Sequence, residues 1–363
     1  MPRWLLVLLL CGCGACGGSN KTAATPTTPT PPPTPSPGSQ RVFYVSPSGN
    51  DANDGSISGP WGTLRHAVAQ LRAGDTLYLR GGTYRGPIAT ENEIDTEQGP
   101  VPSGTSWSNP ITIAGYQGET AVIQPPASGN AFGIRLKSSA PSYLIFQDFV
   151  IDLSEQTSEA QAGVYVAGGA NHNRFLRLEI RNSINFGVVF ASSAGDAPFN
   201  EVVNCRIHNN GMPNGAETNG HGMYILTGDN LIDGNDVYDN QGYGIHVYDN
   251  QGPMIVSRNT ISNNTVHGNG RHGGTAYGIV VAWGDSNVVH DNTVYGNPGG
   301  ILIYTNSTNA NVFNNTVHDN SPLEGILIQF ATGTIINNNN VYGNGQNIVN
   351  LGTGTVLTNN TTR

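Results

Sequence analysis

The sequence predicts an all-β protein whose chain winds through stacked coils of three short strands each. Of its 363 residues, 48 are glycine and only 11% are charged, whereas about 25% is usual for soluble domains. Five-residue segments of glycine, apolar, variable, apolar and variable residues recur along the chain, and asparagines recur every five residues between them. Both residue types favour bends over helix interiors, so composition and periodicity together indicate a repeated β-structure.

The first sixteen residues are predicted to form a lipoprotein signal peptide. Arg3 precedes an apolar run from Trp4 to Leu10, which is too short to span a membrane and suits a secretion signal. Cys13 ends a segment that resembles the bacterial lipobox, and Cys16 is a second candidate. We predict lipidation at Cys13, so that the protein is exported and held at the bacterial cell envelope or surface only by a lipid anchor. The alternative is an ordinary cleaved signal.

Residues 17–40 are predicted to be a linker, because their many prolines and threonines cannot build a core and favour an extended chain. The β-domain then spans 41–363. Cys205 is its only cysteine, so we expect no disulfide within it. In its N-terminal module, 41–110, the segment Thr63 to Leu71 is predicted to be a short helix, with Thr63 as N-cap, that covers the open edge of the first coil.

The glycine-led segments are predicted to form one strand in each coil. Successive glycines lie between 22 and 35 residues apart, which is typical of repeats that stack on one another. The apolar residues should point inward, so the two variable positions should share the outer face. The eight segments begin at Gly133, Gly163, Gly187, Gly222, Gly244, Gly278, Gly300 and Gly325.

The evenly spaced asparagines, such as Asn230, Asn235 and Asn240, are predicted to occupy the bends between strands. Asparagine tolerates the left-handed backbone conformation that a bend requires. Identical amides on successive coils can also form hydrogen-bonded ladders. We therefore assign the asparagines a structural role and no chemistry.

The repeats, above all residues 287–297 (NVVHDNTVYGN), resemble the right-handed parallel β-helix family that contains the pectate lyases. The resemblance covers about residues 41–363. It implies a single-stranded right-handed parallel β-helix with a short N-terminal capping helix in a secreted protein. With the lipobox-like segment, the chain is predicted to be a bacterial lipoprotein member of the family.

The tyrosine and histidine side chains of the two variable columns predict a polysaccharide site on the outer face, because sugar rings stack on aromatic side chains. The alternative is that these side chains are only cross-strand packing pairs. Members of the family commonly cleave acidic polysaccharides by β-elimination, which needs a base, an acid and a group that neutralises a uronate carboxylate. Tyr224 and His246 are predicted to be the acid and base pair, because they occupy one column on adjacent coils. His221, three residues before Tyr224, is the third predicted catalytic residue, and either His221 or Arg271 would meet the carboxylate. The predicted substrate-binding residues are Arg135, Lys137, Tyr165, Glu217, Tyr248, Arg271, His272 and Tyr304.

The distribution of charge and the lengths of the turns predict the surroundings of this site. Six basic residues between 135 and 206 predict an anion-attracting surface over the early coils. The acidic segment 90–110 is predicted to be a solvated turn, and calcium binding by its carboxylates is the alternative. The long turns 208–221 and 267–277 are expected to wall the outer face into a groove. A formal net charge of −9 argues against nucleic acid as a partner.

The sequence is consistent with catalysis with or without a metal ion. Calcium held by clustered aspartates is what the resemblance implies, but no matching cluster is evident. Asp249 and Asp285 end strands and could bind an ion, although aspartate is also an ordinary turn residue. The resemblance also implies an arginine or lysine base, whereas Lys137 is the only lysine after the linker.

The leading hypothesis is a monomeric, surface-tethered β-helix that cleaves or epimerises an acidic polysaccharide. A non-catalytic glycan-binding or adhesin-like β-helix is the alternative, and a glycoside hydrolase is the third. The three differ in their products, since only a lyase creates an unsaturated sugar.

Overall fold

The computed structural model describes residues 40–85, 91–125, 127, 132–156, 162–192, 196–211, 220–248, 255–271 and 275–363. The described residues belong to one compact unit, Ser39–Arg363. The predicted signal peptide, Cys13 and most of the linker lie outside them.

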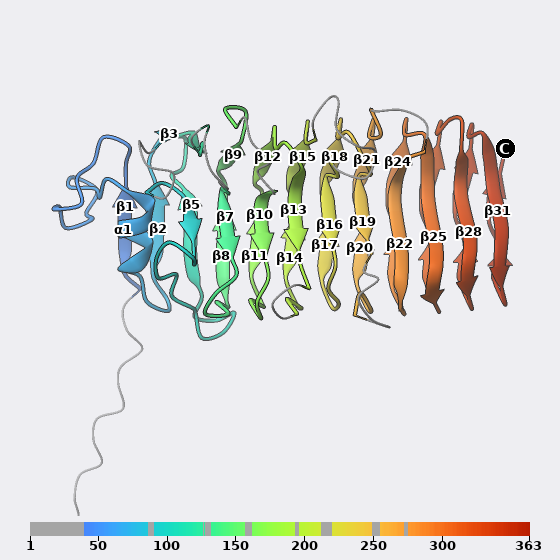
Figure 1. Cartoon of the computed structure of the whole chain (residues 1–363), viewed down its shortest axis with the longest axis horizontal. Helices are drawn as coiled ribbons and strands as arrows, with labels where there is room; N and C mark the ends of the chain where they lie inside the picture. Colours follow the sequence, from blue (N-terminus) through green and yellow to red (C-terminus); the bar gives the residue numbers. More distant parts are fainter. Residues whose placement is uncertain are drawn as a thin grey trace, which may run out of the picture. The chain divides into compact units, whose positions relative to one another are not determined.

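The described chain is a right-handed parallel β-helix built from three parallel sheets, so the predicted fold class is confirmed (Figure 1). Each complete coil contributes one strand to each sheet, the first and last coils contribute to fewer, and strands of successive coils lie side by side. Sheet A contains β1 (Val42–Val45), β2 (Thr76–Leu79), β5 (Ile111–Gly115), β8 (Leu144–Gln147), β11 (Arg174–Leu176), β14 (Glu201–Val203), β17 (Leu231–Asp233), β20 (Thr260–Ser262), β23 (Val288–His290), β26 (Asn311–Phe313), β29 (Ile335–Asn337) and β32 (Val356–Thr358).

Sheets B and C complete each coil. Sheet B contains β3 (Gly82–Tyr84), β6 (Ala121–Ile123), β9 (Val150–Asp152), β12 (Glu179–Arg181), β15 (Arg206–His208), β18 (Asp236–Tyr238), β21 (Thr265–His267), β24 (Thr293–Tyr295), β27 (Thr316–His318), β30 (Asn340–Tyr342) and β33 (Thr361–Thr362). Sheet C contains β4 (Ile94–Asp95), β7 (Ile134–Leu136), β10 (Ala162–Val166), β13 (Phe186–Phe190), β16 (Met223–Ile225), β19 (Ile245–Val247), β22 (Tyr277–Asp285), β25 (Gly299–Thr308), β28 (Glu324–Thr332) and β31 (Gln346–Thr353).

The glycine that opens each repeated segment is required by close packing inside the coil. A Cβ on Gly244 would lie 2.5 Å from a methyl of Val266 and 2.6 Å from the carbonyl oxygen of Gly278. The two apolar residues that follow, Ile245 and Val247, are fully buried. Each repeat therefore fills the core with branched side chains and keeps glycine where the chain turns into sheet C.

The asparagines form the predicted ladders. In one ladder the Oδ1 atom of Asn264 accepts the backbone N–H and the side-chain amide of Asn235, both at 2.9 Å. Its own amide donates to Ile232 and to Asn292. The left-handed residue, however, is the one before the ladder position, such as Asn263 with φ 55°. The ladder asparagine itself points inward, and its side chain satisfies backbone groups of the preceding coil.

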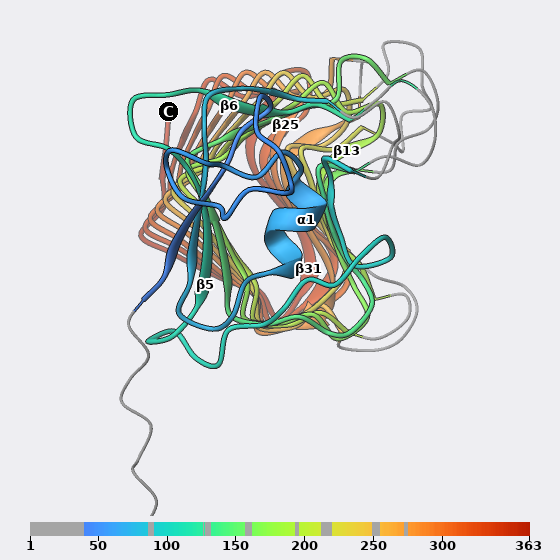
Figure 2. The ribbon, with the colours of Figure 1, turned by 90° about the vertical axis from the view of Figure 1, so that its left-hand side faces the viewer.

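The predicted capping helix is present as α1 (Leu64–Ala69). The Thr63 hydroxyl accepts the backbone N–H of His66, as an N-cap does. Leu64, Ala67 and Val68 are buried, and Figure 2 shows α1 lying across the open end of the first coils. The first core layer is thus covered. None of the described helices is long or apolar enough to cross a bilayer.

Sheet B carries an outer column of stacked rings that the glycine-led pattern does not predict. Neighbouring rings are parallel within 7° and lie 4.6–5.1 Å apart. Stacking of this kind stabilises adjacent strands of a sheet. The rings belong to His208, Tyr238, His267, Tyr295, His318 and Tyr342.

Candidate active site

The predicted acid and base pair lies on the outer face of sheet C. Tyr224 of β16 is directly opposite His246 of β19 in the parallel register. Their ring centroids are 5.1 Å apart and the planes are inclined by 16°. The predicted column is therefore confirmed as a geometric feature, and one sugar unit could contact both side chains.

Three more rings surround His246. The centroids of Tyr243, His221 and Tyr248 lie 4.7, 4.9 and 5.2 Å from that of His246. His221, which is only 1% exposed, also packs against Tyr224. We call these five residues the ring cluster: His221, Tyr224, Tyr243, His246 and Tyr248.

Tyr243 was missed because strict alternation would not place it on this face. It precedes Gly244, whose missing side chain would point into the core, so the alternation breaks there and Tyr243 faces outward. Phe186, His221 and Tyr277 precede glycines in the same way. The sequence signal was available: an aromatic residue or histidine recurs directly before the glycine of successive segments.

His221 is held as a neutral side chain. Its Nδ1 accepts the backbone N–H of Tyr243 at 3.1 Å, so in the neutral ring the proton is on Nε2. Burial lowers the pKa of His221 to about 3. At neutral pH it would meet a carboxylate as a hydrogen-bond donor and not as a cation.

His246 is also uncharged at neutral pH. Burial, and after it the neighbouring His221, lowers the pKa of His246 well below 6.5. Its Nδ1 is shielded from solvent and has no hydrogen-bond partner. Unsatisfied buried polar atoms are rare in folded proteins and often mark functional sites. A neutral imidazole beside a phenol can remove one proton and deliver another.

The other predicted aromatic contacts lie on the same face, at a greater distance along the helix. Tyr165 packs on Phe132, with ring centroids 5.5 Å apart, and is two coils before Tyr224. Tyr304 is two coils beyond the His246 coil and lies near Phe330. They extend an aromatic face along sheet C, which suits the stacking of sugar rings.

The two predicted cationic contacts of the early coils are already paired. Arg135 forms a bidentate ion pair with the buried Asp95, in which Nε lies 2.8 Å from Oδ1 and Nη2 lies 2.5 Å from Oδ2. The Nζ atom of Lys137 lies 3.6 Å from a carboxylate oxygen of Glu97. Both acidic partners come from the segment predicted to be a solvated turn. That prediction is wrong, because Ile94 and Asp95 form strand β4 and join sheet C beside β7.

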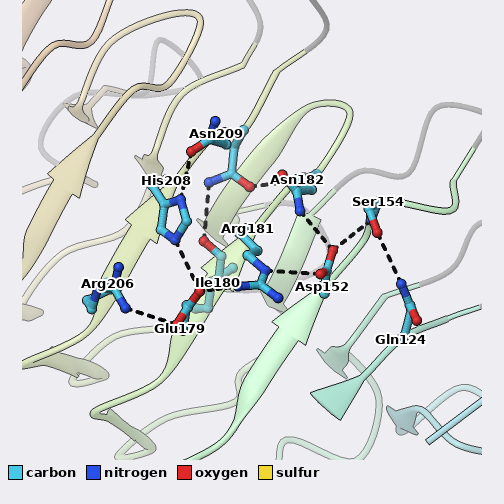
Figure 3. A network of polar contacts seen from close by, with 12 residues as sticks. Gln124, Asp152, Ser154, Glu179, Ile180, Arg181, Asn182, Arg206, His208 and Asn209 are labelled. Atoms are coloured by element: carbon cyan, nitrogen blue, oxygen red, sulfur yellow. Dashed lines mark hydrogen bonds and ion pairs between the residues drawn. The ribbon is translucent and has the colours of Figure 1, made fainter. Parts of the chain in front are cut away.

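The predicted anion-attracting surface over the early coils is also wrong for the described residues. Every one of its six basic residues forms an ion pair with a carboxylate. Figure 3 shows the part of this arrangement on sheet B. There Glu179 forms ion pairs with both Arg181 and Arg206, and Arg181 forms a second ion pair with Asp152. The charges neutralise one another across adjacent coils.

Glu93 should make the fold sensitive to alkaline pH. Burial, and secondarily Asp95, raises its pKa to about 8, and one carboxyl oxygen has no partner. The native state therefore holds this proton more tightly than the unfolded state, so stability from this group is present below about pH 4.5 and is lost as pH rises through 8. We expect Glu93→Gln to raise the free energy of unfolding at pH 9 by about 2–4 kcal/mol, measured by urea denaturation.

A matched control is Glu97→Gln, because Glu97 is exposed and its pKa is lowered, mainly by the Ser138 hydroxyl. The free energy of unfolding of this variant should fall between pH 6 and pH 9, as it does in the parent. Equal pH profiles for the Glu93→Gln variant and the parent would contradict the assignment.

Arg271 does not join the ring cluster. It lines a separate cavity at the corner between sheets B and C, together with Gln241 and Gly211. The predicted contacts Glu217 and His272 lie outside the described residues, as do the central parts of the two long turns expected to form groove walls.

The calcium site of clustered carboxylates that the resemblance implies is not present among the described residues. Among them, no group of three or more histidine, cysteine, aspartate or glutamate side chains could hold a metal, and calcium needs about six to eight oxygen ligands. Asp285 already accepts hydrogen bonds from Ser286, Thr308 and Asn309. Asp249 lies outside the described residues.

Comparison with known proteins identifies the family. The family described as "Pel9A-like, right handed beta helix region" matches residues 43–347. The chain belongs to this Pel9A-like β-helix family. Pectate lyase PEL9 of Emericella nidulans is 30% identical over 229 residues, which are 60% of this chain and 52% of that protein.

Two solved structures share the Pel9A-like fold. That of pectate lyase Pel9A has a TM-score of 0.59 at 18% identity, covering 85% of this chain and 77% of that one. An alginate lyase from Paenibacillus sp. str. FPU-7 has a TM-score of 0.58 at 18% identity, covering 87% and 99%. At these identities the structures support the fold alone. The chain spans about a third to a half of the length of the curated relatives it matches.

Proposed function

We propose that this chain is a polysaccharide lyase that cleaves an acidic polysaccharide by β-elimination on the outer face of sheet C. The observation that carries the proposal is His246, an uncharged imidazole with an unpartnered Nδ1, stacked on the Tyr224 phenol. Relationship to a pectate lyase supports an acidic substrate.

In the proposed reaction His246 removes the proton from C5, the carbon next to the uronate carboxylate. Nε2 is the nitrogen left for this step because Nδ1 is shielded, so Nδ1 holds the proton of the neutral ring. The C5–H electron pair forms the C4=C5 double bond, the C4–O4 bond breaks, and the Tyr224 hydroxyl gives its proton to the leaving oxygen. His221 stabilises the carboxylate by donating a hydrogen bond from Nε2. Solvent then takes the proton from His246 and returns one to Tyr224.

The test is a product assay on polygalacturonate, alginate and glycosaminoglycans, each with calcium and with a chelator. A lyase gives unsaturated ends that absorb in the ultraviolet. Incorporation of deuterium from heavy water at C5 without cleavage would instead indicate an epimerase, which shares the first step. Reducing ends without ultraviolet absorbance would indicate a glycoside hydrolase, and binding without turnover would indicate a glycan-binding or adhesin-like protein. Each of these three results would overturn the lyase proposal.

Lipid attachment at Cys13 and export to the cell envelope belong to the same proposal, because an enzyme acting on a polymer must meet it outside the cytoplasm. Labelled fatty acid supplied to producing cells should be incorporated into the parent and into Cys16→Ser, but not into Cys13→Ser. A monomer is expected and is checked by light scattering on the protein without its lipid.

A further inference from the structure

A second polar site lies at the corner where sheet B leads into sheet C. It is a cavity of about 560 Å³, within the range of about 300–1,000 Å³ usual for small-ligand sites. Its described lining residues come from five successive coils: Leu153, Ser154, Gln156, Asn182, Ser183, Ile184, Asn209, Gly211, Gln241 and Arg271.

The described lining residues offer hydrogen-bonding groups and include no carboxylate. Four side-chain amides and two hydroxyls line it, and Figure 3 shows Asn209, Asn182 and Ser154 following one another along adjacent coils. Ser183 is 1% exposed, and its Oγ has no hydrogen-bond partner. A buried hydroxyl without a partner costs stability unless a ligand or water satisfies it.

Arg271 supplies a positive charge to this cavity. Ten of the described lysines and arginines form ion pairs with carboxylates, but Arg271 is not among them, and it is exposed. A guanidinium binds a carboxylate with two parallel hydrogen bonds. Ile184, which is partly exposed, adds apolar surface on which the C–H groups of a sugar ring can pack, whereas Leu153 is fully buried beneath the cavity.

We propose that this cavity binds an acidic oligosaccharide, with one uronate carboxylate on Arg271 and sugar hydroxyls on Ser183 and the amides. It adds to the ring cluster a second contact for the same polymer and so rests on the proposed substrate class. Gln241 lines the cavity and is two residues before Tyr243 of the ring cluster, so a chain bound here is close to sheet C.

The test measures binding separately from turnover. In a His246→Ala background, isothermal titration uses tetragalacturonate, tetramannuronate and the methyl ester of tetragalacturonate. We expect Arg271→Gln to weaken binding of at least one of the two acids about tenfold, and to leave the affinity for the uncharged ester unchanged. Ser183→Ala should weaken both the acid and its ester about threefold without lowering the melting temperature.

The matched control is Arg72→Gln, since Arg72 is exposed after α1 and also forms no ion pair with a described carboxylate. This control should bind the acid as the parent does. An affinity within twofold of the parent for Arg271→Gln, an equal loss in the control, or no binding of either acid would overturn the proposed site. Failure of the lyase proposal would appear separately, as absence of unsaturated product from the otherwise native protein.

Discussion

Replacing His246 with alanine is expected to lower the rate of elimination by about 10²–10⁴-fold, the usual contribution of a general base. The side chain is half-buried on a folded strand whose core residues Ile245 and Val247 stay in place, so the fold should be retained. Initial rates from ultraviolet absorbance, with circular dichroism as a check of folding, give the result.

Tyr224→Phe should cause a loss of similar size, because it keeps the ring stacked on His246 and removes only the acidic hydroxyl. Tyr295→Phe is the matched control, since Tyr295 is stacked between His267 and His318 on sheet B. That variant should keep the parent rate. Full activity in both His246→Ala and Tyr224→Phe would remove the pair from the active site.

The dependence of the rate on pH should reflect the buried imidazoles. An ordinary histidine base is protonated and inactive below about pH 6.5, but burial keeps the pKa of His246 well below this value. We therefore expect kcat/KM to stay high at pH 5.5 and its acid limb to lie lower. An acid limb centred near pH 6.5 would mean that the base is solvated and that His246 is not the base.

The sequence predicted the outer columns of sheet C because each repeat alternates strictly after its glycine. Because Ile245 and Val247 point inward, His246 between them must point outward. The preceding repeat has the same alternation after its glycine, so Tyr224 lies beside His246 on the adjacent strand. Tyr243 was not predicted, because the break in alternation at Gly244 depends on packing against Val266 in the next coil. Periodicity cannot reveal such a contact.

The pairing of Arg135 could not be predicted for a related reason. Its partner Asp95 lies forty residues earlier, in a segment without the glycine-led pattern. Only the register of β4 beside β7 brings the two side chains together. The number of basic residues predicts a surface that attracts anions, whereas the stacking of the coils pairs these residues with carboxylates and so neutralises their charge.

Asn264→Ala is expected to lower the free energy of unfolding by about 3–4 kcal/mol, although the residue is far from any chemistry. Asn264 is 1% exposed, and its side chain makes four hydrogen bonds. The alanine variant removes the side-chain partners of the Asn235 backbone N–H and of the Ile232 carbonyl, at a cost of about 1–3 kcal/mol for each group that water cannot reach. The Asn235 amide keeps its bond to Val202, and Oδ1 of Asn292 keeps the backbone N–H of residue 264.

Urea denaturation should show this loss as a lower midpoint. The neighbouring variant Asn263→Gly is the control, because Asn263 is left-handed and its side chain has one exposed hydrogen bond to Asp233. Glycine accepts that backbone conformation, so its midpoint should change little. An equal effect at both positions would mean that the bend, and not the amide ladder, holds the coils together. A larger effect at Asn264 would mean that the inward amides carry the stability that lets sheet C present aromatic and histidine side chains outward.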